Sequence, residues 1–299
     1  MAILIDPPLW PAHGTLFSHL VSDASLDELR SFALEQGLPE RAFDRDHYDV
    51  PQNHYETLVA AGALPVSATE LVRRLVCSGL RVPARERPER LDAVLLARWD
   101  RLLPGEPQLG RELLARWSEP HRAYHDRAHL LAILSALDTL TGSNEQNPAH
   151  RALYLAAWYH DAVYNGVPSD ERDSAALAAA QLPGAGLEHA EVGEVVRLVE
   201  LTIEHSPDSG DTAGQLLCDA DLEVLGREAG AYRRYVLSVR REYAHVPDPV
   251  FAAGRASILR KLLESESLYS SPLARSLWEN QARTNLAAEV ERLERPEPA

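Results

Sequence analysis

The strongest constraint on the fold is a helical spacing of apolar residues that runs from Leu91 toward the C-terminus without a convincing strand. Apolar residues recur every three to four positions, which is the spacing along one face of an α-helix. The most apolar stretch follows Pro148, a residue that is favoured at the start of a helix. We therefore expect residues 91–299 to form an all-α domain.

Residues 1–85 have a different pattern. Ala2-Ile3-Leu4-Ile5 reads as a short strand, and residues 63–66 read as another. Ser25 and Ser67 each precede a glutamate by three positions, which is the capping-box signature of a helix start. The order strand, helices, strand and helix favours parallel pairing with crossover helices. We expect a small α/β domain over residues 1–85, joined to the helical domain by a charged, proline-containing linker at 86–90.

Composition limits the classes of function. The formal net charge of −15 would repel a phosphate backbone, which argues against a general nucleic-acid binder. A small phosphorylated substrate remains compatible because a bound metal would dominate the local field. Cys77 and Cys218 are the two cysteines and lack CxxC spacing, so we expect a reducing cytoplasm rather than a disulfide framework or a cysteine zinc site. No run approaches the roughly 20 apolar residues of a membrane span, so no membrane association is expected.

The apolar stretch ends on the adjacent pair His160-Asp161. A buried carboxylate needs a partner to offset its lost hydration, and a metal ion is an obvious one. Upstream, His125 and His129 are four residues apart, in a helix that we expect to start near Ser118, so their side chains should share one helix face. Imidazole and carboxylate ligands together suit divalent metals, with water in the remaining positions.

Downstream residues could complete this site. Asp219 and Asp221 flank a small residue and precede an apolar segment. His205 closes an amphipathic helical run, where it would either interact with the helix dipole or bind a second metal or a phosphate. Glu171 lies in the first turn of another predicted helix, where it would either interact with the helix dipole or hydrogen-bond to a catalytic water.

This ordered set resembles the HD superfamily of metal-dependent phosphohydrolases, which is named for its His-Asp pair. The family's usual order, a histidine, the doublet and a later aspartate, matches His129, His160 with Asp161, and Asp221. The resemblance covers about residues 90–295 and is closest to an uncharacterised bacterial subgroup of predicted hydrolases. It implies one or two divalent ions per chain, drawn from Mn, Fe, Zn, Ni, Co and Mg, and Asp161 as the bridge if two are bound.

Two local motifs are similar to those of cyclic-nucleotide phosphodiesterases. They are Tyr124-His125 followed by His129, and Ala220-Asp221-Leu222. In those enzymes the first histidine is the general acid and the second is a metal ligand, which implies that His125 is a proton donor. The second motif favours Asp221 over Asp219 as the ligand, with Asp219 capping a helix or holding a water.

The resemblance implies hydrolysis of a phosphate ester or phosphoanhydride bond in a small molecule, foremost a nucleotide. Two alternatives stay open: an HD-fold di-iron oxygenase, in which His205 would serve the metal centre, and a regulatory module that binds a nucleotide without turnover. Dinucleotide-binding, P-loop and serine-hydrolase motifs are absent from the sequence. Three arginines near the motifs would bind phosphate by their planar fork or, as we expect, form surface salt bridges: Arg122, Arg127 and Arg172.

The N-terminal segment has a polar set of its own and resembles a bacterial domain of unknown function. Turn and cap chemistry explains its aspartates, and a second active site is the alternative. The set consists of Asp6, His13, His19, Asp23, Asp44, Asp46, His47 and Asp49.

Overall fold

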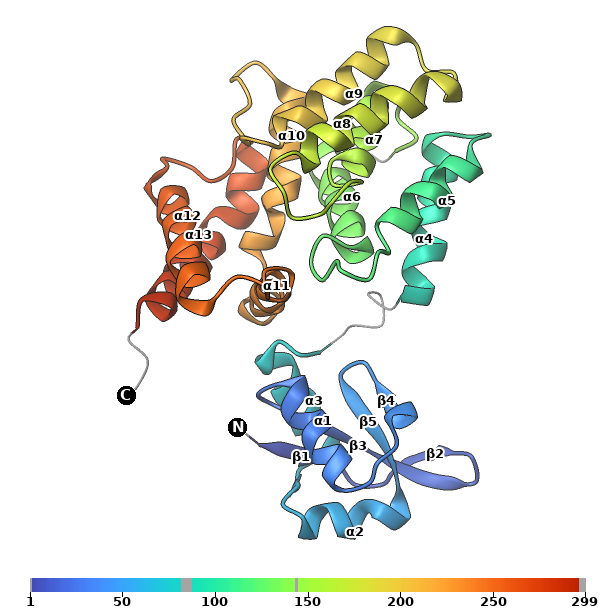
Figure 1. Ribbon diagram of the computed structural model, residues 1–299, viewed down its shortest axis with the longest axis vertical. Coiled ribbons are helices and arrows are strands. Elements are labelled where there is room, and N and C mark those ends of the chain that lie inside the picture. Colours follow the sequence, from blue (N-terminus) through green and yellow to red (C-terminus); the bar gives the residue numbers. More distant parts are fainter. Residues whose placement is uncertain (1, 82–87, 143–144, 296–299) are drawn as a thin grey trace. The chain divides into compact units, whose positions relative to one another are not determined.

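The computed structural model describes residues 2–81, 88–142 and 145–295 (Figure 1). The chain divides into two compact units, Met1–Ala84 with Ala229–Arg234, and Arg85–Glu228 with Tyr235–Ala299. The first is built around a small sheet, and the second is all-helical in its described residues. The expected fold class, a small α/β domain followed by an all-α domain, is confirmed.

The N-terminal unit contains a six-stranded sheet in the order β4-β5-β3-β1-β6, with β2 paired to β3. Among the strands of the described residues, only β1 and β6 pair in parallel, and the other pairs are antiparallel. The expected parallel pairing therefore holds for this pair alone. The elements are β1 (Ile3–Ile5), β2 (Trp10–Ala12), β3 (Thr15–Ser22), α1 (Leu26–Glu35), η1 (Glu40–Ala42), β4 (Phe43–Asp44), β5 (His47–Pro51), α2 (Gln52–Ala60), β6 (Leu64–Pro65) and α3 (Ala68–Ser78).

The helix starts of this unit follow local chemistry. The Ser25 side chain accepts the backbone N–H of Glu28, and that of Ser67 accepts the N–H of Glu70, so both predicted caps are confirmed. The middle strands were not predicted. Apolar residues cover both faces of the sheet: Leu20, Tyr48 and Val50 belong to one cluster, and Leu4 and Val21 belong to another beside α3. Strands that are buried on both faces lack the alternation of apolar and polar residues by which a half-exposed strand is predicted.

From residue 88 onward, the described residues contain helices and no strand. Helix α4 begins at Pro88, within the proposed linker 86–90, because proline is well tolerated in the first turn of a helix; residues 86 and 87 lie outside the described residues. The elements are α4 (Pro88–Leu102), α5 (Pro107–Arg116), α6 (Arg127–Thr141), η3 (Pro148–His150), α7 (Arg151–Tyr159), α8 (Asp170–Gln181), η4 (Leu182–Ala185), α9 (His189–Leu201), α10 (Thr212–Asp221), η5 (Leu222–Gly226), α11 (Ala229–Glu242), α12 (Asp248–Glu264) and α13 (Pro272–Glu294).

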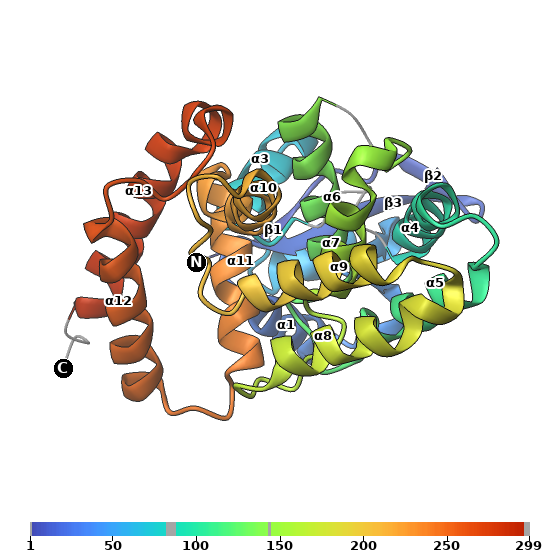
Figure 2. The same cartoon turned by 90° about the horizontal axis from the view of Figure 1, so that it is seen from above.

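Helix α7 is the central element of the helical unit, in contact with α6, α9 and α10 (Figures 1 and 2). Its residues 153–159 are all buried. The Trp158 ring packs edge-on against Trp99 at 5.1 Å between centroids, and its carbonyl accepts the indole N–H of Trp117 at 3.0 Å. Burying side chains of this size contributes about 1.5–3 kcal/mol each, so the end of α7 is held firmly in place.

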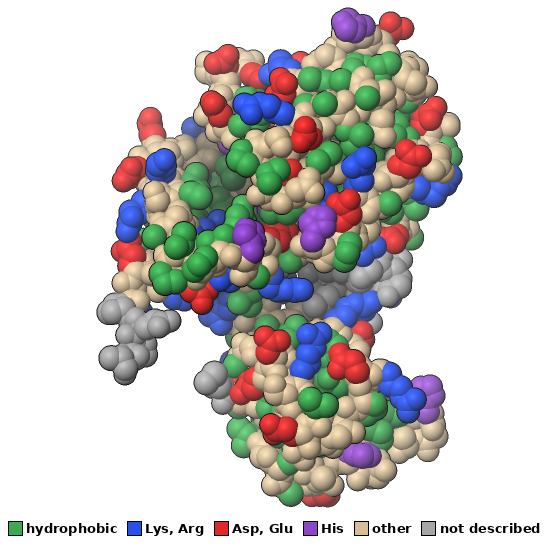
Figure 3. Space-filling view, in the orientation of Figure 1, with side chains coloured by type: hydrophobic (Ala, Val, Ile, Leu, Met, Phe, Trp, Pro, Cys, Tyr) green, Lys and Arg blue, Asp and Glu red, His purple; other side chains and the backbone are tan. Residues whose placement is uncertain are grey.

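The described surface is charged and mixed in sign. Figure 3 shows acidic and basic side chains interspersed over the visible face of the helical unit. Within the described ranges, no helix is both long enough and apolar enough to cross a membrane.

Candidate metal centre

Helix α6 supplies the first histidine, but it begins later than expected. Asp126 is its N-cap, and the Asp126 carboxylate accepts the backbone N–H groups of Ala128 and His129. His125 therefore precedes the helix and His129 lies in its first turn, so the prediction that both share one helix face is wrong. Aspartate is among the strongest N-caps, which places the helix start directly after it. The two rings still lie 5.6 Å apart between centroids.

The buried end of α7 supplies the doublet. His160 is the C-cap residue, and its Nδ1 lies 2.9 Å from the carbonyl oxygen of Ala157. That carbonyl can only accept, so Nδ1 carries the proton and Nε2 is the atom available to bind a metal. Trp117 packs against the His160 ring at 5.4 Å between centroids, which fixes the ring plane.

Four side chains converge at this point. His129 Nε2 lies 3.4 Å from His160 Nε2 and 3.2 Å from Asp221 Oδ1. His160 Nε2 lies 3.2 Å from Asp161 Oδ2 and 3.8 Å from Asp221 Oδ1. Ligand atoms around one ion with bonds of about 2.0–2.2 Å are separated by roughly 3–4 Å, so these separations suit a divalent metal. The ligand atoms of His129, His160 and Asp161 all lie within 4.8 Å of one another, and Asp221 approaches the two histidines. We call these four residues the central cluster.

The charges within the central cluster are mutually stabilising. Burial disfavours the charged form of His160, but the adjacent Asp161 and then Asp221 raise its pKa to about 9. Burial also opposes ionisation of Asp161 and Asp221, yet the neighbouring histidines hold the pKa of each carboxyl well below its usual range. Burial lowers the pKa of His129. The two carboxylates are thus ionised and ready to bind a cation.

His205 approaches from the other side of Asp221. Helix α9 ends at Leu201, and His205 has a left-handed backbone with φ of +49°. Few non-glycine residues adopt this conformation, which here turns the ring toward the cluster. His205 Nε2 lies 2.8 Å from Asp221 Oδ2, while Asp221 Oδ1 faces His129. Asp221 therefore lies between the central cluster and His205.

Glu242, at the end of α11, is a site residue that the sequence analysis missed. Its Oε1 accepts the backbone N–H groups of residues 123, 124 and 125 at 2.8–3.0 Å, and Oε2 lies 2.8 Å from His125 Nδ1. Burial raises the pKa of the Glu242 carboxyl, but the hydrogen bonds from His125 and the backbone outweigh it and lower the pKa to about 2. Ionised Glu242 can only accept, so Nδ1 of His125 carries a proton and Nε2 faces Asp161 Oδ2 at 4.0 Å.

Arg122 anchors the segment that carries His125. The buried guanidinium donates to the carbonyl oxygens of His125, Asp161 and Ala162 at 2.8–3.2 Å. It thereby ties the His125 segment to the His-Asp doublet. The Arg122 Nε also donates to the half-exposed Glu119 at 3.1 Å, so the expected salt bridge is present, but the guanidinium is buried rather than on the surface. Arg127 forms a surface salt bridge with Asp92, and Arg172 is exposed.

Two predicted site residues lie apart from the cluster. Asp219 accepts the backbone N–H groups of Ser270 and Ser271 at 2.6 and 2.7 Å, just before α13. Both of its oxygens accept hydrogen bonds from this turn, so the structure does not bring Asp219, the second candidate metal ligand, to the cluster; this agrees with the preference for Asp221. No hydrogen bond or ion pair among the described residues joins Glu171 to the central cluster; its carboxylate instead lies close enough to Tyr243, a pocket residue, to add to the effect of burial in raising the pKa of that hydroxyl.

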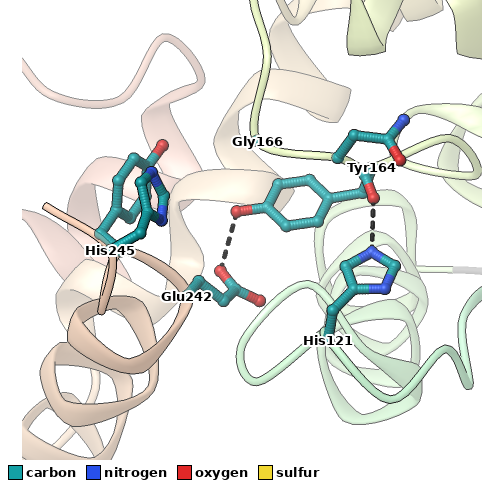
Figure 4. A pocket seen from close by; sticks show the side chains of 7 residues that line it. His121, Tyr164, Gly166, Glu242 and His245 are labelled. Carbon is teal, nitrogen blue, oxygen red and sulfur yellow. Dashed lines mark hydrogen bonds between the residues drawn. The ribbon is translucent and has the colours of Figure 1, made fainter.

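A pocket of about 320 Å³ adjoins the His125 side of the centre. Figure 4 shows the Tyr164 ring between His121 and Glu242, with the Tyr164 hydroxyl donating to Glu242 at 2.9 Å. Tyr243 and His245 also line the pocket, and Figure 4 shows His245 on the side opposite His121. Tyr164 also stacks on His125 at 4.3 Å between centroids, so Tyr164 and Glu242 both line this pocket and contact His125.

These features define a small α/β domain followed by a helical domain, with a His/Asp group in each unit that could hold a metal ion. The second group consists of His19, His47 and Asp49. Residues 3–78 match a family described as a protein of unknown function (DUF4031). No curated protein and no solved structure matches the chain.

Proposed function

We propose that the helical unit is an HD-type metal-dependent phosphohydrolase that acts on a small phosphorylated molecule, with a nucleotide as the leading substrate class. The observation that carries the proposal is the convergence of His129, His160, Asp161 and Asp221 beside a histidine that a carboxylate holds in one orientation. The order of these residues in the chain agrees with the family resemblance of the sequence.

The central cluster would hold a divalent ion. Such an ion would lower the pKa of a coordinated water toward about 7 and polarise a phosphoryl oxygen of the substrate. The cluster residues and their neighbours orient the ligand atoms and supply the negative charge. The Ala157 carbonyl fixes the Nδ1 proton of His160, and Asp161 and Asp221 bring two negative charges to a buried position.

His125 would act as the general acid. Glu242 holds the Nδ1 proton, so Nε2 is the atom that donates its proton to the leaving oxygen. Burial disfavours the charged imidazole, but Glu242 and Asp161 raise the His125 pKa above its ordinary value, which keeps the donor proton in place near neutral pH. After the transfer, the Glu242 carboxylate still holds the neutral ring in position.

The pocket beside Tyr164 would take the part of the substrate away from the phosphate. Its volume lies at the lower end of the usual range for small-molecule sites, about 300–1,000 Å³. Tyr164, Tyr243 and two histidines give it aromatic walls that suit stacking on a flat ring such as a nucleobase.

The test combines metal analysis with a substrate screen on protein purified without chelator. Wild type should hydrolyse at least one member of a panel of nucleotides and sugar phosphates. His160→Ala and Asp161→Ala should lose both turnover and the metal of the helical unit, whereas His125→Ala should lose turnover and keep the metal. Unchanged metal content in both cluster variants would contradict the proposal.

Two other results would redirect the assignment. Two irons per chain with substrate-dependent oxygen consumption would identify the oxygenase alternative. Tight binding of a nucleotide without product would identify the regulatory module. His205 contacts Oδ2 of Asp221, the oxygen that faces away from His129. His205→Ala should therefore lower the metal content of a two-ion centre and leave that of a one-ion centre unchanged.

A further inference from the structure

The N-terminal unit contains a second convergence of histidines and carboxylates, which the proposed hydrolase function does not use. His19 on β3 lies directly opposite Asp49 on β5 in the antiparallel pair. His47 precedes Asp49 by two residues, so both project from the same face of the strand. Tyr48 and Val50 alternate with them and belong to the core on the other face. The sheet register therefore places His19, His47 and Asp49 side by side.

Both imidazoles are oriented by buried carboxylates. His19 Nδ1 lies 3.0 Å from Asp6 Oδ2, and His47 Nδ1 lies 2.6 Å from Asp46 Oδ1. Asp6 and Asp46 are 1% and 2% exposed. A carboxylate at Nδ1 holds the ring proton there and leaves Nε2 as the ligating atom, which is the usual support of a metal-binding histidine.

The ligating atoms face one another. His47 Nε2 lies 3.5 Å from Asp49 Oδ1, and His19 Nε2 lies 4.0 Å from the same oxygen. One ligand atom from each of the three residues lies within 4.8 Å of the other two. These separations match two nitrogens and one oxygen around a single ion with bonds of about 2.0–2.2 Å.

The group is also accessible. The side chains of His19 and Asp49 are 27% and 50% exposed, whereas that of His47 is 10% exposed. The Trp10 ring packs edge-on against His19 at 5.3 Å between centroids and forms one wall. Three protein ligands with solvent access leave coordination positions free, which is typical of catalytic rather than structural metal sites.

We propose that His19, His47 and Asp49 form a second divalent-metal site in the N-terminal unit, with open positions for water or a substrate. Two imidazoles and one carboxylate suit Zn²⁺, Co²⁺ or Fe²⁺ and disfavour Ca²⁺ and Mg²⁺, which take oxygen ligands. The site would give this unit a metal chemistry of its own, separate from that of the helical unit.

The test uses the full chain with the central cluster disabled by Asp161→Ala and Asp221→Ala. After metal removal, the protein is titrated with Co²⁺ and followed by visible absorption and elemental analysis. One equivalent should still bind. Adding His19→Ala or Asp49→Asn should abolish that binding, while His54→Ala, which removes an exposed histidine from α2 of the same unit, should leave it unchanged.

Further variants distinguish the loss of a metal ligand from the loss of the fold. Asp49 is half-exposed, so Asp49→Asn removes a ligand charge with little effect on the core, and circular dichroism verifies the fold. In the otherwise wild-type chain, the same substitution should lower the total bound metal by one equivalent. Asp46→Asn should weaken Co²⁺ binding by about 10- to 100-fold through loss of the supporting carboxylate. The proposal is overturned if the cluster-disabled chain binds no Co²⁺, or if its binding is the same with and without His19 and Asp49; the group is then an ion-pair cluster only.

Discussion

His125 and Glu242 are 117 residues apart in the chain and lie 2.8 Å apart between Nδ1 and Oε2. The same carboxylate accepts three backbone N–H groups from the loop that carries His125. Glu242 thus fixes both the path of the loop and the tautomer of the ring. In the proposed reaction this makes Glu242 a positioning residue for the general acid.

We expect Glu242→Gln to reduce kcat by about 10²-fold, the lower end of what a positioned general acid contributes. The amide oxygen can still accept backbone N–H groups, so the loop should stay in place while the charge beside His125 is lost. Metal content, measured by elemental analysis, should equal that of wild type. The control is Glu264→Gln, which alters an exposed carboxylate at the end of α12.

The same variant should shift the pH dependence of the rate. Glu242 helps to raise the pKa of His125 against the effect of burial, and a general acid works only while protonated. Activity should therefore decline with rising pH through the His125 pKa, and in Glu242→Gln this decline should occur at lower pH. A pH–rate profile whose alkaline limb does not move would argue against the assigned role of His125.

Asp219 and Asp221 form a matched pair for testing the cluster. Asp221→Asn should weaken metal binding in the helical unit because it removes a charged oxygen that faces two histidines. Asp219→Ala should retain the metal but leave two backbone N–H groups before α13 unpaired, at about 1–3 kcal/mol for each. Elemental analysis and denaturant unfolding separate the two effects. Loss of metal in Asp219→Ala, with the fold intact, would return Asp219 to the ligand set.

The parts of the fold that could be predicted are those set by neighbours in the sequence. The Ser25 and Ser67 caps and the helical spacing after Leu91 are local signals, and the structure follows them. The strands β3 and β5 were missed because their pairing joins distant segments and both sheet faces are covered. The start of α6 was misplaced because the Asp126 cap outweighs the helical spacing of the histidines that flank it.

The candidate site likewise contains residues that could be predicted from the sequence and residues that could not. His160 and Asp161 could be chosen because they end a buried apolar run, which makes their polarity conspicuous. Glu242 could not be chosen, since in the sequence it follows two arginines on an amphipathic helix and looks like an ordinary surface charge. The separate roles of Asp219 and Asp221 depend on which way each points from α10. Spacing alone does not resolve that direction.

Arg122→Met should destabilise the helical unit by about 2–4 kcal/mol, because it leaves three carbonyl oxygens, one buried and two part-buried, without this donor and removes the ion pair with Glu119. The loop that carries His125 should also lose its tie to the His-Asp doublet. Denaturant unfolding measures the change in stability. Arg172→Met, which alters an exposed arginine, is the control and should change the free energy of unfolding by less than about 0.5 kcal/mol.

Metal binding by the central cluster should release about one proton near neutral pH, because a ligating imidazole must be neutral. Asp161 and Asp221 raise the pKa of His160 to about 9 against the effect of burial, so its Nε2 is protonated at pH 7, whereas burial lowers the pKa of His129 and leaves that ring neutral. Metal affinity should therefore rise about tenfold per pH unit between roughly pH 7 and 8.

Calorimetry in buffers of different ionisation enthalpy measures the number of protons released when the metal binds. The protein carries His19→Ala and Asp49→Asn, which remove the N-terminal group. A release near two protons would mean that both histidines are charged before the metal binds, and no release would mean that His160 is already neutral beside Asp161.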